Sequence, residues 1–158
     1  MNNSISIVNV IQLMLAPGLM ISACGLLLLS MNNKYSLVVN RIRLLNEERR
    51  KLVAKIDKEF KYQENTRMES LSVQIHSLAY RAKLVRNAVL SYSIAVGLFI
   101  LTSLLIGIEY FSDTEKLSYF ITALFLLGMV SVFLGVIFAS YETIKGYEII
   151  QFEVKTEE

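Results

Sequence analysis

The sequence predicts an all-α membrane protein with three transmembrane helices and a coiled-coil-like antiparallel helical hairpin in the cytoplasm between helices 1 and 2. Three observations lead to this prediction. The chain of 158 residues is 54% hydrophobic, with a mean hydropathy of +0.47, whereas soluble domains are usually about 45–50% apolar. Three stretches exceed the roughly 18 residues that indicate a spanning helix, and none contains a charge. All charged residues lie between or after these stretches.

This partition of charge sets the predicted boundaries and the orientation. The expected segments are a first transmembrane helix kinked at Pro17 (1–31), a basic cytoplasmic hairpin (32–86), a second transmembrane helix (87–109), a short outer loop (110–117), a third transmembrane helix (118–140) and an acidic cytoplasmic tail (141–158). The hairpin contains 13 Lys or Arg and 6 Asp or Glu. Because Lys and Arg of short loops stay on the inner side, we expect a multi-pass protein of the cytoplasmic (inner) membrane with its N-terminus outside and its C-terminus in the cytoplasm. The first residues lack Lys and Arg, so no cleavable signal peptide is expected.

Apolar residues within the hairpin recur at the spacing of a coiled-coil seam. They are Val38, Ile42, Leu45, Leu52 and Ile56 on the first arm, with Arg49 at the skipped position, and Met68, Leu71, Ile75, Leu78, Ala82, Val85 and Val89 on the second. Thr66 and Glu69 form a capping-box pattern that predicts the start of the second arm, which places the tip near Gln63–Asn65. After Ser140 the pattern suits a helix or a strand, Gly146 is a candidate helix end, and the acidic tail is a candidate for docking on the basic hairpin.

Small and polar residues inside the spans are candidates for a path or for helix packing. Pro17 frees the carbonyl of Leu13, as in the broken helices that line transporter pathways; a simple packing kink is the alternative. Small residues at helical spacing allow close helix approach in lipid. The path candidates are Gln12, Pro17, Gly18, Ser22 and Gly25, and the packing candidates are Ser93, Gly97, Ser131, Gly135 and Ala139. Because three helices cannot enclose a hydrated path, a pore would require a homo-oligomer.

Basic residues of the hairpin are candidates for contact with anionic lipid headgroups or another anion. They are Arg41, Arg43, Arg49, Arg50 and Arg86, and each such charge near a membrane surface contributes about 1 kcal/mol. An anion-attracting vestibule or a site for a soluble acidic ligand are the alternatives. Nucleic acid is not an expected partner because aromatic residues are sparse and Glu is interspersed. Glu109 and Glu142 are expected to be ordinary interfacial residues, or charged rings in a symmetric assembly.

Patterns for catalysis or cofactor binding are not found in the sequence. The single cysteine, Cys24, excludes an intrachain disulfide and a CxxC metal site. The single histidine, His76, has no Ser or Asp arrangement around it, and no HExxH, GxSxG or Gly-rich phosphate loop occurs. We therefore expect no enzymatic activity, no catalytic residue, no cofactor and no bound metal.

One part of the chain resembles a known family. The segment 15–30 (LAPGLMISACGLLLLS), followed by NRIRLL at 40–45, is similar to a family of small prokaryotic membrane proteins known only as a domain of unknown function. The resemblance extends through the entry into the second span at Arg81–Asn87 and covers the chain to about residue 140. It implies three spans with a cytoplasmic loop. It implies no activity and no binding residues.

Two functions remain open from the sequence. The leading hypothesis is a homo-oligomeric channel for ions or small solutes, with the first helix lining the path. The alternative is a non-conducting scaffold or signalling protein whose hairpin recruits a cytoplasmic protein. Off-seam residues for such a contact are Tyr35, Val39, Leu44 and Phe60.

Overall fold

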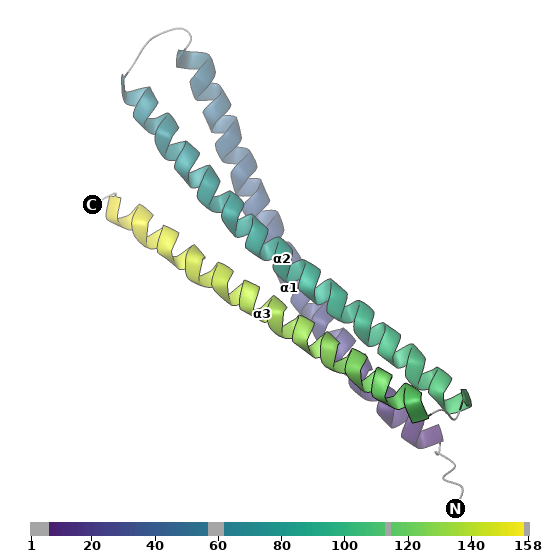
Figure 1. The fold of residues 1–158 in the computed structure, drawn as a ribbon. Coiled ribbons are helices and arrows are strands. Elements are labelled where there is room, and N and C mark those ends of the chain that lie inside the picture. Colours follow the sequence, from purple (N-terminus) through teal and green to yellow (C-terminus); the bar gives the residue numbers. More distant parts are fainter. Residues whose placement is uncertain (1–6, 57–61, 113–114, 157–158) are drawn as a thin grey trace, which may run out of the picture. The chain divides into compact units, whose positions relative to one another are not determined.

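The structure, a computed structural model, contains three long α-helices among its described residues (Figure 1). They are α1 (Ile7–Ile56), α2 (Tyr62–Ser112) and α3 (Glu115–Thr156). Residues 1–6, 57–61, 113–114 and 157–158 lie outside the described part, and side chains are described for 8–54, 67–110 and 117–146. Within the described ranges no strand occurs, so the all-α prediction is confirmed there.

Each of the three helices is long and apolar enough to cross a membrane. The chain covers little of these apolar surfaces, because only 11% of the most apolar stretch of α1 is buried, against 22% in α2 and in α3. Leu26 is 71% exposed and Phe133 is 66% exposed. A soluble monomer rarely exposes so large an apolar area, whereas lipid solvates it. The chain is therefore a multi-pass membrane protein.

Two compact units make up the chain. Residues 1–31 and 87–138 form one unit, here called the apolar unit, and residues 32–86 and 139–158 form the other, here called the charged unit. All three helices contribute residues to both units. Lys116 is the single Lys or Arg of the apolar unit, so nearly all of the positive charge of the chain belongs to the charged unit.

The core of the apolar unit takes side chains from all three helices. Cys24 of α1 is buried together with Ala95 and Phe99 of α2. Met20, Ile21, Val96, Phe125 and Val132 pack around them. The rings of Phe99 and Phe125 lie 5.5 Å apart between centroids, at an interplanar angle of 55°, which is within the range favoured by aromatic pairs.

Two glycines of α3 lie against aromatic rings of α2 in the apolar unit. A Cβ added to Gly128 would lie 2.7 Å from Cε1 of Phe99, and one added to Gly135 would lie 2.6 Å from Cε1 of Tyr92. The later glycine, Gly135, meets the earlier ring, Tyr92, so these stretches of α2 and α3 run antiparallel. Such close approach through small residues is typical of membrane helices, where lipid competes for every apolar contact.

The predicted seam residues of the charged unit face its interior. Val38 and Leu45 of α1 and Leu71 and Val85 of α2 are buried, and the other described seam residues are half-buried. An ion pair joins the two helices, with Arg67 Nη2 lying 2.8 Å from Glu48 Oε1. Arg49, at the skipped position, is exposed, so the seam does not contain a buried arginine.

Three element bounds differ from the prediction. α2 begins at Tyr62, so Gln63–Asn65 and the capping-box pair lie within the helix, and the tip of the predicted hairpin falls in residues outside the described part. Only residues 113 and 114 separate α2 from α3, so the predicted loop 110–117 is mostly helical. α3 continues through Gly146 to Thr156, which excludes the strand interpretation and the helix end at Gly146.

Candidate functional site

Glu142 is the most buried charged group of the described residues, and it defines the candidate site. Its side chain is only 2% exposed. It lies on α3 within the charged unit, two residues after the charge-free stretch 118–140. Because an isolated buried carboxylate is strongly unfavourable, the contacts around Glu142 determine whether this part of the unit is stable.

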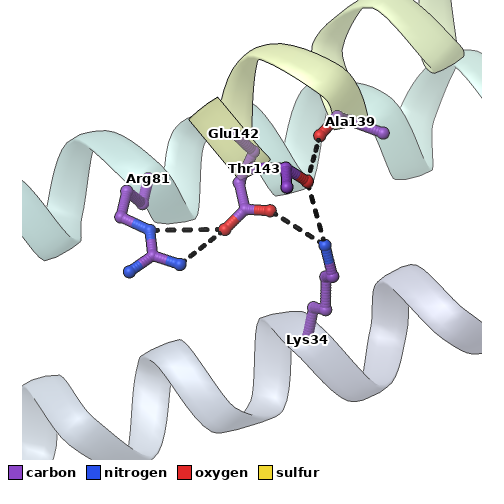
Figure 2. A network of polar contacts seen from close by, with 5 residues as sticks. All are labelled: Lys34, Arg81, Ala139, Glu142 and Thr143. Carbon is purple, nitrogen blue, oxygen red and sulfur yellow. Dashed lines mark hydrogen bonds and ion pairs between the residues drawn. The ribbon is translucent and has the colours of Figure 1, made fainter. Parts of the chain in front are cut away.

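Two cations from different helices bind the two oxygens of this carboxylate (Figure 2). Arg81 of α2 donates from Nη2 to Oε1 at 2.7 Å and from Nε to the same oxygen at 3.3 Å. Lys34 of α1 donates from Nζ to Oε2 at 3.2 Å. The carboxylate of α3 therefore links both other helices of the charged unit.

A hydroxyl group extends this network on the side of Lys34. The Nζ of Lys34 also donates to Thr143 Oγ1 at 3.3 Å, and that hydroxyl donates to the carbonyl of Ala139 at 3.0 Å (Figure 2). Ala139, predicted from its size to pack against a helix, thus participates through its backbone carbonyl. The chain of contacts fixes the position of the lysine ammonium relative to α3.

The charge state of Glu142 follows from its surroundings. Burial acts to raise the pKa of its carboxyl, but the hydrogen bonds from Arg81 and Lys34 and their positive charges outweigh this effect. The pKa of Glu142 is therefore lowered, and the group is ionised at neutral pH. One carboxylate between two cations leaves the network with one excess positive charge.

Gly146 explains how Arg81 reaches Glu142. A Cβ added to Gly146 would lie 2.8 Å from Arg81 Nη2 and 3.1 Å from Arg81 Cζ. The missing side chain, one helical turn beyond Glu142, therefore leaves room for the guanidinium group. This is a packing reason for a glycine inside α3, and it replaces the helix end expected from sequence.

A groove of about 350 Å³ adjoins the network. It is lined by Lys34, Leu37, Val38, Arg81, Glu142, Thr143 and Gly146. Lys34 is 43% exposed and Arg81 is 22% exposed, so both cations are accessible from it. Among the described residues no group of three or more His, Cys, Asp or Glu could hold a metal ion. The groove therefore presents positive charge beside an apolar wall.

The arginines predicted from sequence lie outside this network. Arg41, Arg43, Arg49, Arg50 and Arg86 are all exposed. Glu142 was expected to be an ordinary interfacial residue, and the structure instead buries it between two cations. One sequence signal indicates the position of Arg81: it precedes Val85 and Ala88 by four and seven residues, on the buried stripe of α2. Lys34 has the same signal on α1, because it follows the buried Met31 by three residues and precedes the buried Val38 by four.

The predicted path and packing residues fall into two groups in the apolar unit. Gln12, Gly18, Ser22 and Gly25 of α1 are exposed, as are Ser93 and Gly97 of α2. Among the described residues, nothing lies within 4 Å of a Cβ added to Gly18, Gly25 or Gly97. Pro17 is buried, and α1 continues through it. Ser131 and Gly135 contact α2, and Ser131 Oγ donates to the carbonyl of Ser91 at 2.8 Å.

The chain belongs to the family described as Protein of unknown function (DUF2721), whose model matches residues 14–152. The match includes all the residues of the network and most of the three helices. No curated protein and no solved structure is significantly similar to the chain.

Proposed function

We propose that the protein is a non-catalytic homo-oligomer of the cytoplasmic membrane, in which α1 of each subunit faces the other subunits and lines a path for ions or small solutes. One observation supports this proposal most directly. Gly18, Ser22 and Gly25 form an exposed stripe on α1, and among the described residues nothing lies within 4 Å of a Cβ added to either glycine. The spacing of four and three residues places them on one face of the helix.

Lipid as the surrounding solvent explains why an uncovered stripe of small residues favours self-association. In lipid, apolar side chains gain little from leaving the solvent, so helices associate where small residues let their backbones approach closely. α3 uses its small residues in this way against α2. The glycines of α1 have no such partner among the described residues, and the most apolar stretch of α1 is less buried than those of α2 and α3. A second copy of the chain is the partner that supplies a matching stripe.

Gln12 lies on a different face of α1 from the stripe of small residues. At about 100° per residue, Gln12 lies about 120° around the helix from Gly18. Gln12 is also exposed. The stripe with Gly18 therefore forms the subunit contact in this proposal, and Gln12 is the polar residue that borders the path.

The orientation belongs to the same proposal. The 13 Lys or Arg of residues 32–86 favour a cytoplasmic location for this segment. The contact of Glu48 with Arg67, and the approach of Lys34 and Arg81 to one carboxylate, fit two hairpin arms that run in opposite directions. A reporter fused near residue 64 should be active only in the cytoplasm, and activity on the outer side would contradict this orientation.

The subunit contact is tested by enlarging one residue of the stripe. Gly25→Leu should weaken self-association about tenfold, because it separates the helix backbones. Ala23→Leu is the control for association, since Ala23 is also exposed on the same helix but lies on the face of Gln12, away from the contact stripe. Association is measured by sedimentation in detergent. Equal association of the wild type and both variants would contradict the assembly.

Conduction is tested separately in liposomes. The wild-type protein should support ion flux, and Gly25→Leu should lose it together with the oligomer. An intact oligomer without flux at any voltage or pH would overturn the channel part of the proposal.

An intact oligomer without ion flux would favour the alternative function, a non-conducting scaffold that recruits a cytoplasmic protein. Leu44 of the charged unit is 64% exposed, and Tyr35 is also exposed while Val39 is half-buried. Phe60 lies outside the described residues. These side chains are available for a cytoplasmic protein, and their replacement by Ser should then abolish its binding without affecting the oligomer.

A further inference from the structure

The groove beside Glu142 holds more positive charge than its own carboxylate neutralises. Arg81 uses Nε and Nη2 for Glu142, and a guanidinium group also has donors on its other terminal nitrogen. Among the described residues none accepts a hydrogen bond from that nitrogen. Lys34 makes two hydrogen bonds, to Glu142 and Thr143, and an ammonium group can donate three. Among the described residues, the network of Lys34, Arg81 and Glu142 therefore has a net charge of +1 and unused donors for an anion.

The groove also has an apolar wall. Leu37 and Val38 of α1 line it together with the two cations. Leu37 is 70% exposed. A purely ionic ligand gains nothing from such a wall. An amphipathic ligand, with a charged group and a hydrocarbon part, would contact both surfaces.

The position of the residues along the chain selects the class of ligand. Lys34 is the first charged residue after the first charge-free stretch, and Glu142 is the first after the third. The first charges after a span lie at the level of the lipid headgroups. Arg81 is at the same level because it binds the same carboxylate. At that level of the membrane, the anions that also have a hydrocarbon part are phospholipids.

We propose that this groove is a binding site for the phosphate of an anionic phospholipid, held by Lys34 and Arg81 while its glycerol and upper acyl chains lie against Leu37 and Val38. This site is distinct from the exposed arginines of the charged unit. The inference goes beyond the proposed channel and does not depend on it, because a monomer contains the whole groove.

The test measures lipid retained by the purified full-length chain. The protein is equilibrated in mixed phosphatidylglycerol and phosphatidylcholine, and the molecules that remain bound are counted by native mass spectrometry. Phosphatidylglycerol should be retained preferentially. Leu37→Glu places a negative charge in the groove without removing an ion pair, and should lower this retention about fivefold. Leu44→Glu is the matched control, because it makes the same change at a 64% exposed leucine of the same helix outside the groove.

Leu37→Lys separates charge from packing. It should retain phosphatidylglycerol at least as well as the wild type. Equal losses in Leu37→Glu and Leu37→Lys, equal losses in Leu37→Glu and Leu44→Glu, or no loss in any variant would overturn the site. A final experiment measures the binding of inorganic phosphate to the same protein. If phosphate displaces phosphatidylglycerol and binds equally well without lipid, the groove is a site for a soluble anion and the lipid proposal is wrong.

Discussion

In the apolar unit glycines of one helix pack against aromatic rings of another, whereas in the charged unit one carboxylate between two cations joins the helices. Gly128 and Gly135 of α3 lie against Phe99 and Tyr92. Glu142, on the same helix, binds Lys34 and Arg81. α3 thus contacts its neighbours by close packing in the apolar unit and by ion pairs in the charged unit.

The solvent explains this difference. Inside lipid, shape complementarity distinguishes one helix contact from another, because apolar side chains are solvated equally well by lipid. Near water, an apolar seam has a hydrophobic driving force, and a buried ion pair adds specificity about which helices meet. Mutations of glycine contacts and mutations of the ion-pair network should therefore differ in their effect on stability.

Removing the buried charge should have the largest effect. Glu142→Gln leaves Lys34 and Arg81 facing one another without a carboxylate, and breaking a buried pair in this way typically costs about 3 kcal/mol. The free energy of unfolding in detergent should fall by about that amount. Lys51→Gln is the control, because the Lys51–Glu47 pair is exposed and such pairs contribute at most about 1 kcal/mol. Equal effects of the two changes would contradict a structural role for the cluster.

Adding one methyl group in the apolar unit should have the next largest effect. Gly135→Ala places a Cβ 2.6 Å from the ring of the buried Tyr92, and overpacking of this kind costs about 2 kcal/mol. Gly97→Ala makes the same change where nothing described lies within 4 Å. It should be neutral or stabilise the monomer by up to about 1 kcal/mol, because alanine favours helix. Unfolding in detergent measures both, and equal values would show that the close contact is absent in solution.

The same methyl group in the charged unit should be tolerated better. Gly146→Ala places a Cβ 2.8 Å from the guanidinium tip of Arg81, which can shift more easily than an aromatic ring in a core. We expect a cost of about 1 kcal/mol. Combining Gly146→Ala with Glu142→Gln should abolish the extra cost, because the arginine is then no longer held. Fully additive effects would show that Gly146 acts independently of the network.

The contribution of Glu142 to the free energy of unfolding should be lost at acidic pH. The pKa of Glu142 is lowered in the folded protein from its ordinary value of 4.5. Ionisation of this group therefore stabilises the fold above that value, and the contribution is lost as the pH falls through the folded pKa. Unfolding measured from pH 7 downward should show a decline below pH 4.5 that is smaller in Glu142→Gln. The same decline in both proteins would assign it to other carboxyl groups.

The smallest effect is expected at Arg49. If Arg49 were buried in the seam, Arg49→Leu would stabilise the charged unit by removing an unpaired charge. The structure places Arg49 on the surface, so the change should alter the free energy of unfolding by no more than about 0.5 kcal/mol. A clear increase in stability would show that the seam contains this residue in solution.

Part of the site could be read from the sequence, and part could not. The seam positions Val38, Leu45, Leu71 and Val85 follow from apolar spacing, because a helix presents residues three and four apart on one face. The spacing does not show which charged residue meets another across helices. The burial of Glu142 and its two partners from distant segments therefore required tertiary information.

The end of α3 shows the same limit. Gly146 interrupts a pattern that suits either a helix or a strand, and local propensity favours a break at glycine. The helix continues to Thr156, and the guanidinium group of Arg81 occupies the space that a side chain would need. A contact 65 residues away in sequence, between 81 and 146, supplies a reason for glycine that local preference does not contain.

Composition and charge spacing are enough to predict three apolar, uncharged helical stretches with most of the positive charge between the first two, because lipid and water favour residues of different polarity. The tertiary structure alone decided which small residues of these helices meet aromatic rings, which remain uncovered, and which acid binds which bases. Those choices depend on the facing of helices far apart in sequence, and the pattern within one helix does not specify its neighbours.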